Sequence, residues 1–316
     1  MTSLTLFRWE TASTTEHLAN IINRSTFARE KSPLKILDLC SGTGCILLLL
    51  RHLLGTSPPG LAVQGLGIDV SDRAVSLARR NADSTSELLA ERRGGVMDFR
   101  MGDIFDRRGM NERLEPRTDQ EHVDAKHMKR IHFDVLVSNP PYVSPKQYRC
   151  ATTRSVRLYE PEIALVPPQL ALEPSRPDGP CVEQDVASMD QLFASMGATV
   201  DAADAKIADR FYPALLVMAV ETGVKMLLFE VGDAAQAARV VKLVQGAMKG
   251  VWHDVGLEIW RDEPGVEQVY RVSRETTCGV AEEEAGLRAL ENVLIRGRGN
   301  IRAVFAYAGR VLSPQG

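Results

Sequence analysis

The chain has 316 residues, 44% hydrophobic and 25% charged, which is typical of a globular protein with one large α/β domain or two small ones. The net charge of -3 and the pI of about 6.1 leave no basic excess, which disfavours nucleic-acid binding through bulk electrostatics. The five cysteines are odd in number and form no CxxC pair, which indicates reduced thiols rather than a disulfide framework or a zinc site. No apolar run approaches the roughly 18 residues that span a bilayer, and the first ten residues lack the pattern of a secretory signal.

The first part of the chain predicts a strand–loop–helix unit. After an amphipathic helix over residues 14–22, we expect a strand over 34–39, a tight loop over 40–44 and an apolar helix over 45–54. Gly42 and Gly44 let the loop backbone approach a ligand closely. Asp38 beside the loop disfavours a bound pyrophosphate and suits a ligand with a cationic centre or an ammonium group.

Acidic residues also follow the next two expected strands. The strand over 61–68 ends in Asp69, a position from which a carboxylate can chelate the hydroxyls of a ribose. The strand over 96–101 is followed by Asp103 and Ile104, which could bond an adenine amino group and cover its ring. Each acid alone fits a helix cap or a solvated charge, but three acids after three successive strands form a more specific pattern.

A proline turn ends the fourth expected strand, residues 133–138. Its sequence, Asn139-Pro140-Pro141-Tyr142, places an Asn side chain and a proline carbonyl at the carboxyl end of a strand, where open α/β sheets bind ligands. Both oxygens can accept N–H bonds, so the turn is a candidate holder for a planar amino or amide nitrogen.

The remaining segments are less informative. Residues 107–130 are polar and indicate a solvated insertion, and their histidines, with His132 just beyond, lack the spacing of a metal site. We expect a loop over 167–185, helices over 201–220 and 234–248, an acidic loop over 277–288, and strands over 225–230, 252–260 and 300–307.

Several motifs together resemble one enzyme family. Residues 38–44 (DLCSGTG), 67–69 (GID) and 138–142 (SNPPY) occur in the order found in class I S-adenosylmethionine-dependent methyltransferases. Within these, the chain resembles the HemK/PrmC family of release-factor glutamine N5-methyltransferases. Residues 7–11 (FRWET), 159–165 (YEPEIAL), 227–232 (LLFEVG), 253–255 (HDV) and 261–262 (RD) add local similarity, so that the resemblance runs from about residue 7 to 308.

The resemblance implies a Rossmann-like α/β fold with a mostly parallel seven-stranded sheet, helices on both faces and an antiparallel last strand. It implies a methyltransferase domain over 33–310, with insertions near 106–131 and 167–205. Residues 1–32 form a short lead-in, and the small helical domain that precedes the Arg-Trp-Glu-like motif in bacterial and mitochondrial members is expected to be absent or lost from the gene model. Cys40 stands where a glycine is usual, which the loop tolerates if the backbone φ there is negative.

The implied reaction is methyl transfer from S-adenosyl-L-methionine to the glutamine side chain in the GGQ motif of a peptide chain release factor. Catalysis falls to Asn139, Pro140 and Tyr142, which bind the substrate together with Pro141. The cofactor is expected to contact a larger set: Asp38, Cys40, Ser41, Gly42, Thr43, Gly44, Asp69, Asp103, Ile104 and Asn139.

Two rival interpretations remain open at this point. One is adenine-N6 methylation of DNA or RNA, since an exocyclic amine suits the same turn, although this would require a basic groove and base flipping. The other is a degenerate methyltransferase that acts as a binding partner. For the enzyme, the resemblance implies a mitochondrial location, with the cytoplasm as the alternative, and a monomer that meets nucleic acid only through the ribosomal termination machinery and does not bind membranes.

Overall fold

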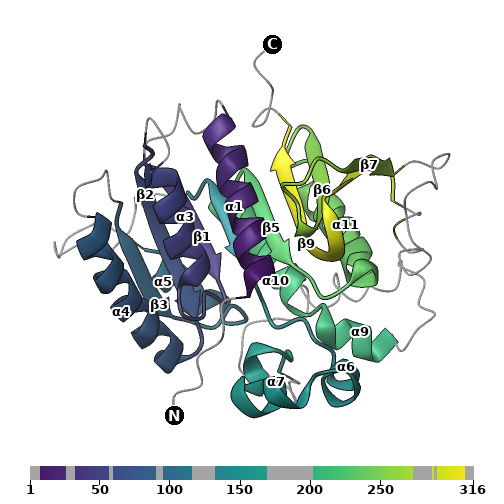
Figure 1. Cartoon of the computed structure of the whole chain (residues 1–316), viewed down its shortest axis with the longest axis horizontal. Coiled ribbons are helices and arrows are strands. Elements are labelled where there is room, and N and C mark those ends of the chain that lie inside the picture. Colours follow the sequence, from purple (N-terminus) through teal and green to yellow (C-terminus); the bar gives the residue numbers. More distant parts are fainter. Residues whose placement is uncertain are drawn as a thin grey trace.

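A nine-stranded sheet forms the centre of the described part of the molecule (Figure 1). The computed structural model describes residues 8–25, 33–56, 60–89, 95–115, 132–168, 202–272, 287 and 290–309. The strands are β1 (Leu34–Leu39), β2 (Val63–Asp69), β3 (Met97–Met101), β4 (Val135–Ser138), β5 (Met226–Glu230), β6 (Val255–Glu263), β7 (Val269–Val272), β8 (Val293–Arg296) and β9 (Arg298–Ala308).

The strand order is β3-β2-β1-β4-β5-β9-β6-β8-β7. Strands β1 to β5 run parallel to one another, and β9 runs antiparallel between β5 and β6. The expected α/β class, with a mostly parallel sheet and an antiparallel last strand, is confirmed. The sheet has two strands more than the seven expected, because β8 pairs with β6 and β7 pairs with the outer edge of β8.

Helices cover both faces of the sheet (Figure 1). One core cluster contains residues from α1 (Trp9–Arg24), α3 (Cys45–Thr56) and α4 (Asp72–Leu89), and the other from α5 (Arg107–Leu114), α10 (Phe211–Thr222) and α11 (Ala234–Met248). Strand β1 contributes residues to both clusters, since Leu34 and Ile36 belong to the first and Leu37 and Leu39 to the second. Burial on both faces explains why this strand has no hydrophobic–polar alternation in sequence.

Two sequence predictions about helices were wrong in detail. The segment predicted as a solvated insertion begins with α5, which buries Met110 and Leu114; residues 116–131 lie outside the described part. The single helix expected over 201–220 is two helices, α9 (Ala202–Ala208) and α10, separated at Asp209 and Arg210. A proline at 213 falls in the first turn of α10, where its missing N–H costs no helical hydrogen bond.

Short helices lie near the carboxyl ends of the parallel strands. They are α6 (Pro145–Cys150), α7 (Arg154–Tyr159) and the 3₁₀ turn η2 (Glu162–Ala164). The expected loops over 167–185 and 277–288 lie almost wholly outside the described residues. Among the helices that are described, none is both long enough and apolar enough to cross a membrane.

Candidate functional site

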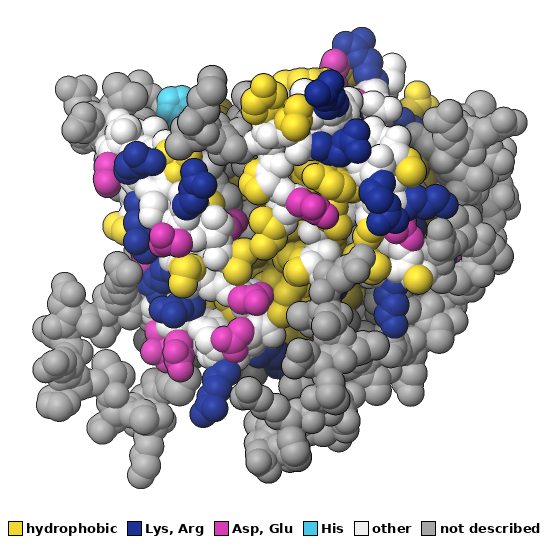
Figure 2. Space-filling view, turned by 90° about the horizontal axis from the view of Figure 1, so that it is seen from below, with side chains coloured by type: hydrophobic (Ala, Val, Ile, Leu, Met, Phe, Trp, Pro, Cys, Tyr) yellow, Lys and Arg dark blue, Asp and Glu magenta, His cyan; other side chains and the backbone are white. Residues whose placement is uncertain are grey.

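The carboxyl ends of β1, β2, β4 and β5 meet at one edge of the sheet. Asp69, Ser138 and Glu230 are the last residues of their strands, and Asp38 is the last but one of β1. Figure 2 looks onto the molecule from this side: hydrophobic side chains occupy its middle, and Lys and Arg side chains lie mostly around them. The parallel pairing therefore gathers side chains that are far apart in sequence, as expected for this fold.

The loop after β1 is tied to the end of β2. The backbone N–H of Ser41 donates to the Ile68 carbonyl at 3.0 Å, and that of Gly42 donates to the Asp69 carboxylate at 2.8 Å. Gly42 and Gly44 have φ values of +53° and +78°, a region that favours glycine. A Cβ on Gly44 would lie 2.7 Å from the Phe99 ring, whereas one on Gly42 would meet nothing within 4 Å. The loop backbone at Gly42 is thus open to a ligand.

The loop was expected to tolerate a cysteine at position 40, in place of the usual glycine, if the backbone φ there is negative. The φ of Cys40 is +61°, so the condition of a negative φ is not met. A side chain in this left-handed region costs roughly 1–2 kcal/mol relative to glycine. The thiol itself is held against the core and its pKa is raised by burial and by the carboxylate of Asp69, so it is a structural rather than a reactive cysteine.

Asp38 and Ser41 carry unsatisfied polar atoms. The Asp38 side chain is fully buried, and neither of its oxygens nor the Ser41 hydroxyl has a hydrogen-bond partner among the residues that the structure describes. Burial raises the pKa of Asp38 well above its usual range, and the neighbouring charge of Asp69 raises it further. An unpaired carboxyl in such a place is costly unless a donor reaches it. An ammonium group on a ligand would satisfy it, which fits the amino-acid end of S-adenosylmethionine.

Asp69 is already hydrogen-bonded but not saturated. Its oxygens accept from the N–H groups of Gly42 and Ser71, at 2.8 and 2.9 Å. Burial raises the pKa of Asp69, and these bonds oppose the rise. A carboxylate oxygen has two lone-pair sites, so each can still accept from a ribose hydroxyl.

The other expected cofactor residues are placed around the same loop. Asp103 accepts from the Phe105 N–H at 2.9 Å, and Ile104 is buried in the core. The Thr43 carbonyl accepts from Asn81 at 3.0 Å, which fixes the end of the loop on α4.

The proline turn after β4 lies directly beside the β1 loop. Ser138 pairs with Leu39 in the sheet, and its hydroxyl donates to the Leu39 carbonyl at 2.6 Å. Pro140 and Pro141 are buried, whereas Asn139 is only partly buried. Within the described part of the chain, no residue forms a hydrogen bond with the Asn139 side chain, so its amide is free to bind a ligand.

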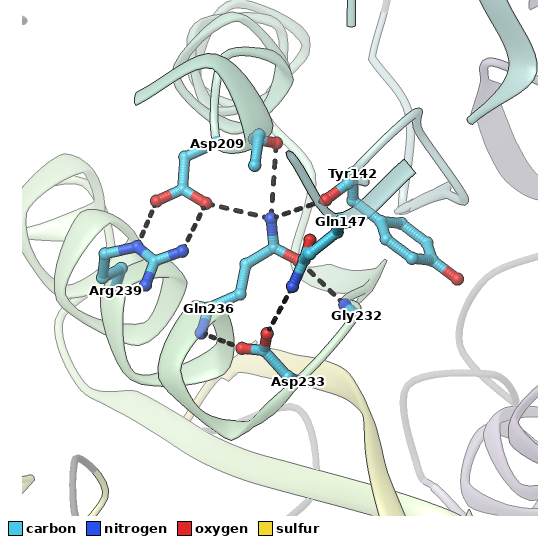
Figure 3. A network of polar contacts seen from close by, with 8 residues as sticks. Tyr142, Gln147, Asp209, Gly232, Asp233, Gln236 and Arg239 are labelled. Carbon is cyan, nitrogen blue, oxygen red and sulfur yellow. Dashed lines mark hydrogen bonds and ion pairs between the residues drawn. The ribbon is translucent and has the colours of Figure 1, made fainter. Parts of the chain in front are cut away.

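Tyr142 completes the turn and is held from several sides. Its hydroxyl donates to Glu230 at 3.4 Å. Its carbonyl accepts from Gln236 at 3.2 Å (Figure 3). The next residue, Val143, donates to the Leu165 carbonyl at 2.8 Å. Helix α6 then begins with a capping box between Ser144 and Gln147, which fixes the direction in which the chain leaves the turn.

Sequence reasoning assigned no role to the residues that support Tyr142. Figure 3 shows Gln236 at the centre, donating to Asp209 at 2.9 Å, while Asp209 forms an ion pair with Arg239. Glu230 was noted only as the end of a strand. The signal that could have identified it is that an acid ends β5 just as acids lie at the ends of β1 and β2.

Metal binding finds no support in this geometry. No group of three or more His, Cys, Asp or Glu side chains in the described ranges could hold a metal ion. His132 is exposed, and the other two histidines of the polar segment, residues 122 and 127, lie outside those ranges.

Comparison with known proteins gives relatives that are all named as glutamine methyltransferases. The chain is 34% identical over 159 residues to the probable MRF1 mitochondrial N(5)-glutamine methyltransferase mtq1 of Schizosaccharomyces pombe, covering 50% of this chain and 43% of the relative. It is 31% identical over 160 residues to the mitochondrial MRF1 N(5)-glutamine methyltransferase MTQ1 of Saccharomyces cerevisiae, covering 50% and 41%. It is 32% identical over 163 residues to a release factor glutamine methyltransferase of Chlorobaculum tepidum, covering 51% and 45%.

These matches confirm the resemblance inferred from the motifs. The aligned part is less than half the length of each of the three relatives. No family model matches the chain. A solved structure titled as a putative class I S-adenosylmethionine-dependent methyltransferase from Listeria monocytogenes is similar with a TM-score of 0.43 and 14% identity, covering 94% of this chain and 59% of its own.

Proposed function

We propose that this chain methylates the N5 nitrogen of a glutamine side chain, in the GGQ motif of a peptide chain release factor, with S-adenosyl-L-methionine as the methyl donor. The observation that carries the proposal is the amide of Asn139, which has no hydrogen-bond partner among the described residues and lies on a proline turn next to the open loop at Gly42. The relatives named as release factor glutamine methyltransferases support the choice of substrate.

The cofactor supplies an electrophilic methyl group on a positively charged sulfur. In this proposal Asp38 accepts from its ammonium group, Asp69 from its ribose hydroxyls, and Asp103 and Ile104 lie at its adenine. The Gly42 backbone lets it approach the loop closely. The unsatisfied oxygens of Asp38 and the open space beside Gly42 support this assignment.

The turn orients the nucleophile. An amide nitrogen is a poor nucleophile because its lone pair is delocalised into the carbonyl, so the rate depends on close approach in the correct direction. The Asn139 oxygen and the Pro140 carbonyl accept the two N–H bonds, and Tyr142 packs on the flat amide. A bond forms between nitrogen and the methyl carbon, the carbon–sulfur bond breaks, its electron pair stays on sulfur, and the nitrogen then loses a proton to solvent.

A labelling assay tests the substrate. Purified chain is incubated with S-adenosylmethionine carrying a labelled methyl group and with a release factor, and the modified residue is identified by mass spectrometry. We expect one methyl group on the GGQ glutamine and none on a release factor with that glutamine changed to alanine. Parallel reactions with duplex and single-stranded nucleic acid test the rival adenine methylation. Label on nucleic acid alone, or no label from a preparation that binds the cofactor, contradicts the proposal.

Two variants separate substrate binding from cofactor binding. Asn139→Ala should lower turnover on the order of 10²-fold or more, because it removes an acceptor that matters in the reactive geometry, and should leave cofactor affinity nearly unchanged. Asp69→Ala should weaken cofactor binding first. Asn111→Ala, on the exposed side of α5, is the matched control and should behave as the wild type. If Asn139 only caps a turn, its variant will lose roughly 1 kcal/mol of stability and keep its turnover.

We propose a mitochondrial location, because the two yeast relatives are named as mitochondrial. Fractionation of cells that express the tagged protein tests this, and recovery in the cytoplasm alone contradicts it. We also retain the proposal that the protein acts as a monomer, which light scattering at assay concentration measures directly.

A further inference from the structure

Glu230 is a buried carboxylate in contact with the tyrosine of the proline turn. It ends β5 and is 7% exposed. One oxygen accepts from the Thr11 hydroxyl at 2.9 Å and the other from the Tyr142 hydroxyl at 3.4 Å. In the described part of the chain, no arginine, lysine or histidine lies within ion-pair distance of it. A buried acid whose hydrogen bonds come from two hydroxyl groups, with no ion pair among the described residues, is costly to keep ionised, so its presence calls for an explanation.

The segment from Glu230 to Gln236 touches Tyr142 at three points. Glu230 accepts from its hydroxyl, and Gln236 donates to its carbonyl at 3.2 Å. Gly232 lies against its ring, since a Cβ there would be 3.2 Å from the ring carbon Cδ2. Gln236 is itself fixed by the Gly232 N–H at 2.8 Å and by Asp209 at 2.9 Å (Figure 3). The connection between β5 and α11 therefore determines where the tyrosine ring lies.

We propose that Glu230 is a positioning residue, whose ionised carboxylate holds the Tyr142 ring against the target amide and links it to Thr11 on α1. The inference rests on the proposed function, because it takes Tyr142 to be the surface on which the amide packs. Neither Glu230 nor Thr11 touches the reacting atoms in this assignment. Their contribution is to keep the ring in one orientation while the amide is held by Asn139.

The charge of Glu230 changes near neutral pH. Burial raises its pKa to about 7. The hydrogen bonds from the two hydroxyl groups and the nearby positive charges favour the ionised form and so lower the pKa, but burial outweighs them. The groups that face it are Thr11 from α1, Arg8 just before that helix, Tyr142 from the turn, and Arg302 from β9. The Tyr212 hydroxyl on α10 donates to its backbone carbonyl. Hydrogen bonds to an ionised acceptor are roughly twice as strong as neutral ones, so the ring is held more firmly as pH rises.

Turnover as a function of pH tests the inference. The wild type should show kcat rising between pH 6 and pH 8, with a midpoint near the pKa of about 7. Glu230→Gln keeps the shape of the side chain and removes its charge; it should lower kcat at pH 8 by about tenfold, the value of one hydrogen bond to a charged group, and lose the pH dependence. Cofactor affinity, measured by calorimetry, should stay close to that of the wild type.

Thr11→Val supplies a second, independent measurement. It removes a hydrogen bond that favours the ionised carboxylate, so the midpoint of the profile should move to higher pH. Thr14→Val is the matched control: Thr14 is also buried on α1, but its hydroxyl donates to the Thr11 carbonyl at 3.0 Å and not to Glu230. A purely structural role for Thr11 would lower stability and leave the midpoint in place.

Two different failures can be told apart. A wild-type protein that binds cofactor and methylates no release factor removes the proposed function. A wild-type protein that does methylate it, with a pH profile that Glu230→Gln leaves unchanged, overturns the positioning role alone. Equal midpoints for Thr11→Val and Thr14→Val would also overturn it.

Discussion

Replacing Glu230 by Gln should make the protein more stable at alkaline pH. The pKa of this buried carboxyl is about 7 in the folded protein, above the usual 4.5 of a glutamate in water. Between these two values the folded state binds a proton that the unfolded state does not, so the free energy of unfolding falls as pH rises through this window and levels off above pH 7. A difference of about 2.5 pKa units corresponds to roughly 3 kcal/mol. The neutral glutamine makes no such contribution at any pH.

The assay is urea denaturation of both proteins at pH 5 and pH 8. We expect the variant to gain roughly 2–3 kcal/mol relative to the wild type between the two conditions, because pH 5 already lies inside the window. Asp38 and Asp69 also have raised pKa values, but both proteins share them, so the comparison isolates Glu230. Glu112→Gln, an exposed position on α5, is the control and should follow the wild type. If Glu230→Gln and the wild type lose stability in parallel over this range, the carboxyl is not held in the way described here.

Four other substitutions test the cofactor loop. Cys40→Gly should raise the free energy of unfolding by about 1 kcal/mol, since it removes a side chain from the left-handed region; thermal melting measures this, and a lower melting temperature would contradict it. Gly42→Ala should weaken cofactor binding and lose roughly 1–2 kcal/mol of stability, because its Cβ meets nothing within 4 Å but its φ is positive. Gly44→Ala should destabilise the fold more, because its Cβ also presses on Phe99, and equal losses of stability from the two would show that the loop differs from this structure. Asp38→Asn should lower cofactor affinity on the order of tenfold or more by calorimetry, as the ammonium group loses its charged partner, and an unchanged affinity would place that group elsewhere.

Much of this architecture could be predicted from local sequence. The five parallel strands, the glycine loop and the proline turn are each specified by residues within a few positions of one another. Asp38 and Asp69 could be identified because acids at strand ends form a pattern that is visible without coordinates. Strands and turns of this kind are fixed by short-range chemistry, so the sequence is sufficient to place them.

The features that were missed depend on contacts over long sequence distances or on backbone angles. The bond between Thr11 and Glu230 joins residues 219 positions apart, and nothing near either one indicates it. The positive φ of Cys40 could not be deduced from a residue type that rarely adopts it. The break between α9 and α10 arises where Asp209 turns to pair with Arg239 on another helix.

The packing of α1 also has a consequence for how the chain folds. Leu18 and Ile22 share a core cluster with Trp260 and Phe305, and the His17 ring lies 4.7 Å from that of Trp260. Part of the surface that α1 packs on therefore lies on strands that come much later in the chain, and an isolated helix of 16 residues is marginal in water. Until those strands emerge, its apolar face stays exposed to chaperones and to aggregation. Thr11 is carried on the same helix, so the hydrogen bond that supports the tyrosine also depends on a contact between distant parts of the chain, and contacts of this kind slow folding.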